Sequence, residues 1–188
     1  MVIDGLDASG KSTQALRLYN FLKGLGKTVY LRFHPSYDNF FGVKAKQFLY
    51  LKGKGAHFAA AVFYMLDVIR SILLYSWRKY EYIIFVRYLM GTAYLPPPLH
   101  IIAYYFFASI VPTSHLMFFL DVSPEEAYRR VEQTREKREM FESLEELYKI
   151  RRKALYLAST NNWVIINANK PIEEIAEAIK LMFQKLYL

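Results

Sequence analysis

Close to its start the sequence reads Gly5-Leu6-Asp7-Ala8-Ser9-Gly10-Lys11-Ser12-Thr13, a complete G-x-x-x-x-G-K-[ST] pattern. A short apolar run precedes the pattern and a helix-like run follows it, which predicts a strand, a glycine-cornered turn and a helix. The start of such a helix offers free N–H groups and a positive dipole end to a phosphate. Lys11 can bridge the terminal phosphates of a nucleoside triphosphate, and the Ser12 hydroxyl can ligate Mg²⁺. The pattern therefore predicts a nucleotide site, the alternative being a glycine-rich turn that binds nothing.

Length and composition indicate an ordinary globular chain. Of 188 residues, 54% are hydrophobic and 22% are charged, so we expect a single domain over 1–188 with a sizeable core. The net charge of +8 suits an anionic ligand, but Lys and Arg are spread along the chain outside one cluster. A nucleotide is therefore favoured over nucleic acid as the partner. The absence of cysteine excludes disulfides, thiolate metal sites and cysteine nucleophiles.

The amino terminus and one long apolar stretch indicate where in the cell the protein is expected. Because the first residues already belong to a strand and to the phosphate loop, we expect no signal peptide and a cytoplasmic protein. The stretch from Ile101 to Leu120 is long enough to cross a bilayer, but Pro112-Thr113-Ser114 interrupts it. We expect a buried helix through Ile110 and a continuously apolar strand at 116–120, as in the centre of a parallel sheet, and no membrane insertion.

Strands and helices alternate along the rest of the chain. Further strands are predicted at 28–33, 82–86 and 163–166. Helices are predicted from Lys11, from about 57 to 79, and after Pro124, Ser143 and Pro171. Five short strands interleaved with helices predict an α/β fold with a parallel sheet covered on both faces. Ligands of such sheets bind beyond the carboxyl ends of the strands, here the loops after residues 4, 33, 86 and 121.

In order along the chain, these features resemble the thymidylate kinases, a family of P-loop nucleoside monophosphate kinases. The resemblance rests on the phosphate loop, Arg32-Phe33-His34-Pro35, Arg87-Tyr88 with Thr92-Ala93-Tyr94, Leu120-Asp121-Val122-Ser123-Pro124-Glu125-Glu126-Ala127, an arginine-bearing lid at about 133–142, and Ile166-Asn167-Ala168-Asn169-Lys170-Pro171-Ile172-Glu173-Glu174. It implies a P-loop NTPase three-layer sandwich with a five-stranded parallel sheet. It also implies Mg²⁺-dependent transfer of the terminal phosphoryl group of ATP to dTMP.

The resemblance assigns residues to two nucleotide sites. ATP is expected at Gly5, Asp7, Ala8, Ser9, Gly10, Lys11, Ser12 and Thr13. The acceptor is expected at Asp7, Arg32, Tyr64, Arg70, Arg87, Tyr88, Thr92 and Tyr94. Within this set Asp7 faces the acceptor sugar hydroxyl and the metal, Arg87 clamps the acceptor phosphate through paired hydrogen bonds, and Tyr64 stacks on the base. Phe63 is the alternative for stacking, and Arg70 lies two positions from the expected arginine.

Each of these assignments competes with an ordinary structural role. An exposed loop aspartate, an arginine in a salt bridge, and aromatic residues in the core would leave the same pattern in the sequence.

The lid is expected to supply a further cation. Some family members carry an arginine inside the phosphate loop, where this chain has Ala8, and others bring it from the lid. With Ala8 present, Arg135 or Arg138 becomes the candidate, beside Lys11 and Arg87, for stabilising the transferring phosphoryl group. The alternative is a solvated helical face, because these cations alternate with glutamates.

Val86 departs from the family, whose members usually show Asp-Arg-Tyr after the third strand. Valine cannot help to hold Mg²⁺, so Ser12 is the expected metal ligand, with Asp7 or Asp121 as the candidate second ligand and Asp4 as a candidate partial substitute for the missing aspartate. Another nucleoside or deoxynucleotide kinase, or a weakly active or inactive nucleotide-binding homologue, stays open as an alternative. The histidines lack metal-ligand spacing; His34 could reach the acceptor cleft, but we expect no role for it. The family is commonly dimeric, which makes a homodimer possible.

Overall fold

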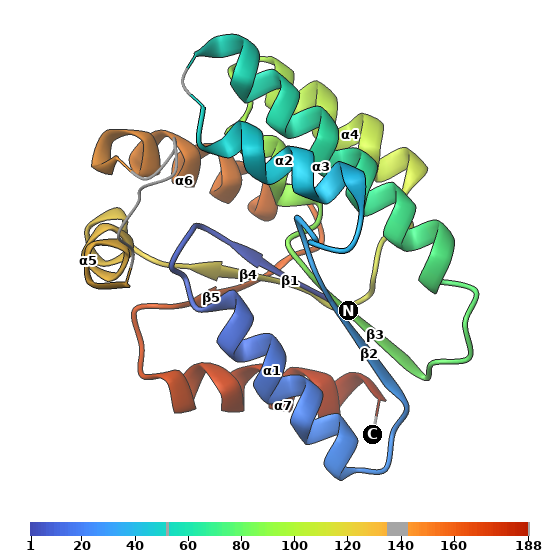
Figure 1. Cartoon of the computed structure of the whole chain (residues 1–188). Helices are drawn as coiled ribbons and strands as arrows, with labels where there is room; N and C mark the ends of the chain where they lie inside the picture. Colours follow the sequence, from blue (N-terminus) through green and yellow to red (C-terminus); the bar gives the residue numbers. More distant parts are fainter. Residues whose placement is uncertain (52, 135–142, 188) are drawn as a thin grey trace.

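The computed structural model describes residues 1–51, 53–134 and 143–187 of the chain. Its centre is a five-stranded, all-parallel sheet in the order β2-β3-β1-β4-β5 (Figure 1). The strands are β1 (Val2–Gly5), β2 (Val29–Phe33), β3 (Tyr82–Val86), β4 (Met117–Asp121) and β5 (Val164–Asn167). Every bound lies within one residue of the sequence prediction. The predicted α/β fold with a five-stranded parallel sheet is therefore confirmed.

Helices cover both faces of the sheet, as predicted for a parallel sheet (Figure 1). One face carries α1 (Lys11–Gly24) and α7 (Ile172–Tyr187), which pack on each other. The other carries α2 (Phe40–Leu49), α3 (Lys54–Tyr75), α4 (Leu99–Ile110) and α6 (Leu144–Ser159). A short helix α5 (Pro124–Thr134) follows β4, and a 3-10 helix η1 (Leu89–Tyr94) follows β3.

Burial along β4 follows from its central place. Met117, Phe118, Phe119 and Leu120 are all buried, because helices cover both faces of this strand. The apolar stretch that imitated a membrane span is thus divided between α4 and β4, as predicted. Among the described residues, Gly55–Tyr75 of α3 is long and apolar enough to cross a membrane by length and composition alone. This helix buries Tyr64, Met65 and Val68 against the rest of the protein, as a core helix does.

Two elements were not predicted, namely α2 and η1. The side chain of Asn39 starts α2 by accepting hydrogen bonds from Phe41 N (2.9 Å) and Gly42 N (3.1 Å). Asp4 orders the start of η1, since its Oδ2 accepts from Tyr88 N (2.7 Å) and Met90 N (3.2 Å). Both elements lie next to the carboxyl ends of the strands, so they shape the edge where ligands of such sheets bind.

Candidate functional site

The loop after β1 has the backbone that its glycines predict. Gly5 has φ 151°, and a Cβ there would lie 2.5 Å from the carbonyl oxygen of Leu120. Gly10, the N-cap of α1, has φ 86°. Ala8 also adopts a positive φ, of 57°, which is strained for a residue with a side chain. The loop is therefore held in one tight conformation that delivers the chain into α1.

The start of α1 is arranged for an anion. Its glycine N-cap gives no side-chain cap, and its first turn has no acidic residue. The buried Lys11 folds back over the loop, where its Nζ donates to Gly5 O (3.0 Å) and to Leu6 O. Ser12 and Thr13 are exposed at the rim. In the part of the chain that the structure describes, the buried Ser9 Oγ has no hydrogen-bond partner. Lys11 is thus already within the curve of the loop, where a phosphate would replace the carbonyls as its partner.

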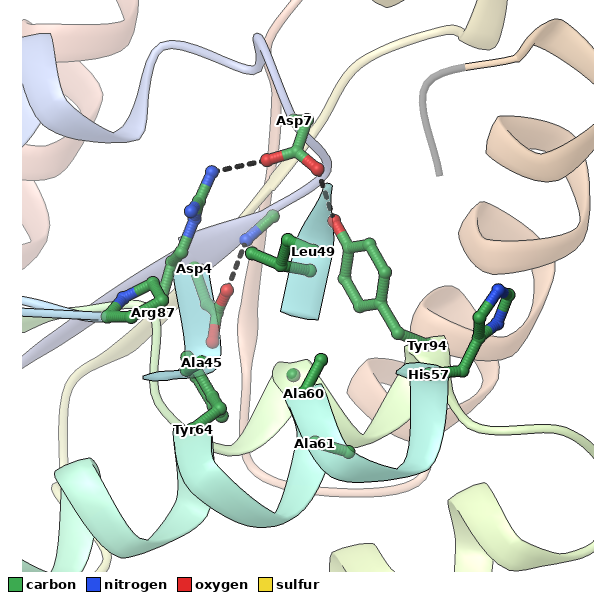
Figure 2. A pocket seen from close by; sticks show the side chains of 13 residues that line it. Asp4, Asp7, Ala45, Leu49, His57, Ala60, Ala61, Tyr64, Arg87 and Tyr94 are labelled. Atoms are coloured by element: carbon green, nitrogen blue, oxygen red, sulfur yellow. Dashed lines mark hydrogen bonds and ion pairs between the residues drawn. The ribbon is translucent and has the colours of Figure 1, made fainter. Parts of the chain in front are cut away.

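Asp7 joins the loop to the neighbouring strand end (Figure 2). Its Oδ1 accepts from Arg87 Nη2 in an ion pair, and its Oδ2 accepts from Tyr94 Oη at 2.9 Å. The three residues come from the β1 loop, the end of β3 and η1. Burial raises the pKa of Tyr94 well above its ordinary value, so this hydroxyl stays a donor at neutral pH. Because β1 and β3 are parallel neighbours, residues 80 positions apart in sequence meet at one edge of the sheet.

Arg87 lies between two cavities. One, of about 60 Å³, is mainly apolar and is lined by Pro35, Ala45, Leu49, Ala60, Ala61, Tyr64 and Gly91, with His57 and Tyr94 at one side (Figure 2). The other, called the polar cleft for the charged side chains on its wall, has a volume of about 530 Å³ and is lined by Ser12, Arg32, His34, Ser36, Lys46 and Arg87 together with apolar residues such as Phe33 and Val86. An arginine shared by an apolar cavity and a polar cleft can hold the charged end of a molecule whose apolar end enters the cavity.

Tyr64 lines the apolar cavity with its aromatic ring. It is 9% exposed, and its hydroxyl donates to Tyr88 O at 3.1 Å. Its ring occupies the space next to Gly91, where a Cβ would lie 2.4 Å from the Tyr64 Cε1 atom. Phe63, the alternative from sequence, packs instead on the rings of Phe40 and Phe48. The fit between Tyr64 and Gly91 was not foreseen.

Three residues expected to bind the acceptor line neither of the two cavities. Tyr88 is 1% exposed in the core, stacks on Phe85, and donates its hydroxyl to Pro112 O (3.0 Å). The buried Thr92 donates within η1, to Leu89 O at 2.8 Å. Arg70 Nη1 is buried and has no hydrogen-bond partner among the described residues. These three side chains belong to the packing around the site rather than to the lining of either cavity.

Arg32 does line the polar cleft, but it is already engaged. Its guanidinium donates two hydrogen bonds to Asp38 (2.6 and 2.7 Å), and its Nε donates to Ser71 Oγ (3.1 Å). The guanidinium holds the pKa of the Asp38 carboxyl well below its usual range. Arg32 therefore shapes the wall of the cleft through Asp38.

Lys46 was not predicted as a site residue; it lies on the same cleft, with its ammonium 3.4 Å from the centre of the Tyr37 ring. Lys46 lies on α2, and because that helix was not predicted, no sequence pattern pointed to this side chain.

The lid lies largely outside the described residues. Arg135 and Arg138 belong to the undescribed segment, so their expected role stays a prediction. Arg130, on the preceding helix α5, is described: it donates to Ala8 O and to Ala168 O, both at 3.2 Å, and to Glu126 at 2.7 Å. Its guanidinium links the phosphate loop to the loop after β5, so Arg130 lies beside Ala8, the loop position at which some family members carry an arginine.

Some of the expected Mg²⁺ ligands are already bonded to other groups of the protein. Among the described residues, no three His, Asp or Glu side chains gather where they could hold a metal ion. Asp121 makes a two-point ion pair with Arg151 (2.7 and 2.8 Å), and Asp4 is bonded to backbone N–H groups through both oxygens. The exposed Ser12 hydroxyl at the loop rim remains, with Asp7 close by in sequence. This donor set fits Mg²⁺ that arrives on nucleotide phosphates and keeps several waters.

Known proteins that are similar to this chain point to one family. The family model described as thymidylate kinase matches residues 3–179. A probable thymidylate kinase from Sulfolobus acidocaldarius is 29% identical over 180 residues, covering 93% of this chain and 90% of that protein. One from Staphylothermus marinus is 25% identical over 181 residues, covering 93% and 89%. One from Pyrobaculum calidifontis is 35% identical over 77 residues, 41% of this chain and 39% of that protein.

The fold also matches a solved structure, that of thymidylate kinase from Candida albicans, with a TM-score of 0.77 and 19% identity over 98% of this chain and 90% of that chain. At that identity the match supports the fold alone, whereas the family model spans nearly the whole sequence. The chain belongs to the thymidylate kinase family.

Proposed function

We propose that this protein transfers the terminal phosphoryl group of ATP to dTMP and forms dTDP. One observation carries the proposal: the phosphate loop and Arg87 lie at neighbouring strand ends and are joined through Asp7. Phosphoryl transfer needs two phosphates held in line and positive charge where negative charge builds up. A loop for one phosphate and an arginine for the other, linked by a single residue, meet that need.

On the donor side, the loop N–H groups and Lys11 would bind the phosphates of ATP. The Lys11 ammonium has three donors, and its present partners include the carbonyls of Gly5 and Leu6. A phosphate oxygen in the loop would exchange these neutral acceptors for a charged one, which strengthens the hydrogen bonds. Ser12 would hold Mg²⁺, which neutralises phosphate charge when bound.

On the acceptor side, the phosphate of dTMP would compete with Asp7 for Arg87. A phosphate offers the guanidinium two parallel hydrogen bonds and more negative charge than one carboxylate. Asp7, released from Arg87 but still bonded to Tyr94, would then face the sugar hydroxyl. The base would enter the apolar cavity beside Tyr64, whose hydroxyl bond to Tyr88 O fixes the ring. In the protein without nucleotide, Arg87 is thus held in an ion pair with Asp7 inside the site.

Val86 supports one rival proposal, a nucleotide-binding protein with little or no turnover. The side chain is buried at the end of β3 and lines the polar cleft, so this position offers no ligand to a metal. The rival predicts that ATP binds without diphosphate product, and that Val86→Asp creates or raises turnover.

The test is an assay of diphosphate formation with ATP and Mg²⁺ against dTMP, dUMP, dCMP, dAMP, dGMP and thymidine. Our proposal expects the highest kcat/KM with dTMP. Preference for another acceptor would redirect the proposal to a different nucleotide kinase. ATP binding by calorimetry without product from any acceptor would support the rival.

We further propose that the enzyme works in the cytoplasm as a homodimer. The outer side of α3 and α4 carries exposed large apolar side chains, among them Leu66 (38% exposed), Leu73 (63%), Ile102 (60%) and Phe106 (58%). A second copy would remove such a surface from water. Sedimentation at micromolar concentration tests this proposal, and a strictly monomeric species would contradict it.

A further inference from the structure

The backbone at Arg87 is strained. Its φ is 63°, in the left-handed region that a residue with a side chain rarely adopts. Such a conformation persists only where the surroundings hold it, and it is common at functional sites. The direction of the Arg87 side chain depends on this conformation, because φ sets where the Cα–Cβ bond points.

Two hydrogen bonds hold the carbonyl groups on each side of this strained φ, and both come from His34. His34 N donates to Val86 O at 3.0 Å, and His34 Nδ1 lies 3.0 Å from Arg87 O. Arg87 N donates to Ile3 O (3.1 Å), which ties the residue to β1. One histidine at the end of β2 therefore holds the last two carbonyl groups of the β3 end.

The chemistry of the contact fixes the state of the ring. A carbonyl oxygen can only accept, so Nδ1 must carry the proton. Burial lowers the pKa of His34 to about 4, so the ring is neutral at physiological pH and donates from Nδ1 alone. The side chain is 3% exposed and stacks on Phe85, with centroids 5.6 Å apart. Among the described residues, His34 Nε2 has no hydrogen-bond partner. The residue is thus built into the wall as a rigid donor aimed at Arg87 O.

We propose that His34 is a positioning residue: by holding the Arg87 carbonyl, it keeps the Arg87 guanidinium between the apolar cavity and the polar cleft, where it pairs with Asp7. The proposal rests on the proposed function insofar as the anion that Arg87 receives is the phosphate of dTMP. Sequence alone treats His34 as a loop residue without a role, because its contacts with residues 86 and 87 depend on the pairing of β2 with β3.

The first test compares two substitutions. His34→Phe keeps an aromatic ring against Phe85 but removes the donor. His34→Asn loses the ring but places an amide N–H donor at the position of Nδ1. With wild-type protein as reference, we expect His34→Phe to raise the KM for dTMP about tenfold, the effect of one buried hydrogen bond, and to leave the KM for ATP unchanged. His34→Asn should recover most of the dTMP affinity. Equal increases in both KM values, or no rescue by asparagine, would overturn the proposal.

A double-mutant cycle separates positioning from general damage to the fold. In an Arg87→Ala background the guanidinium is absent, so adding His34→Phe should change the KM for dTMP less than twofold. A full further tenfold loss would mean that His34 acts independently of Arg87 and would refute the proposal.

Crystal structures of His34→Phe and His34→Asn give a readout that does not depend on turnover. We expect Arg87 to leave the left-handed region in the phenylalanine variant and to keep it in the asparagine variant. Arg87 unchanged in both would overturn the inference even if the kinase is active. Conversely, a wild-type protein without dTMP turnover would contradict the proposed function alone. Should His34→Phe fail to fold, His34→Gln replaces it, since its amide lies one bond farther out and should not rescue.

Discussion

Gly91→Ala tests how the apolar cavity is built. The new Cβ would lie 2.4 Å from Tyr64 Cε1, whereas ordinary contacts begin near 3.4 Å, so the ring must shift by about 1 Å. Overpacking of a buried site costs about 1–3 kcal/mol. The shift would also break the hydrogen bond from the Tyr64 hydroxyl to Tyr88 O, worth about 1 kcal/mol. We therefore expect the free energy of unfolding to fall by about 2–4 kcal/mol.

Urea denaturation of the nucleotide-free protein measures this loss, with Gly55→Ala as the matched control. A Cβ at Gly55, also in a helix near the site, meets nothing within 4 Å, so this variant should be neutral or slightly stabilised. Combining Gly91→Ala with Tyr64→Leu should cost less than the sum of the single changes, because the clashing ring is gone. A Gly91→Ala protein within about 0.5 kcal/mol of wild type would refute the account of the cavity.

Four further predictions concern Lys11 and Ala8 in the phosphate loop, the acceptor arginine Arg87, and the pH dependence of stability. Lys11→Ala should abolish phosphoryl transfer and leave the circular dichroism spectrum unchanged; a variant with normal turnover would contradict the assignment of the phosphate loop. Arg87→Ala should raise the KM for dTMP far more than the KM for ATP; a larger effect on the KM for ATP would contradict its placement at the acceptor. Ala8→Gly should raise the free energy of unfolding by about 0.5 kcal/mol, since relief of the positive φ outweighs the added chain entropy, and a lower value would contradict the strain. His34 binds its proton at lower pH in the folded chain, with a pKa of about 4, than in the unfolded chain, near 6.5. Stability should therefore fall as pH decreases from about 6.5 to about 4, and His34→Asn, which cannot titrate, should show a shallower slope in denaturant midpoints across that range.

Local patterns were enough to predict the sheet. Five strands were predicted to within one residue of their ends from the apolar runs, the phosphate-loop pattern and the helix caps. The apolar runs are clear because both faces of a parallel sheet must be covered. Helix α2 escaped prediction because its aromatic residues suggested no helical period, although Asn39 was available as an N-cap signal.

The site was predictable only in part. The resemblance identified Asp7, Arg87, Tyr64 and Tyr94, which the structure brings together around one cavity. It could not separate them from Tyr88, whose side chain turns into the core, because alternate residues near a strand end face opposite ways. The Asp7–Arg87 ion pair and the contacts of His34 depend on strand pairing between distant segments, which no local pattern contains.

The most direct test of the central claim is a steady-state measurement of dTDP formation from ATP and dTMP, with Mg²⁺, by purified wild-type protein and by Arg87→Ala. We predict measurable turnover by the wild type and a large loss of kcat/KM for dTMP in the variant, with ATP binding retained. ATP binding by wild-type protein without any dTDP, or an Arg87→Ala variant as active as wild type, would contradict the claim that Arg87 holds the acceptor opposite the phosphate loop.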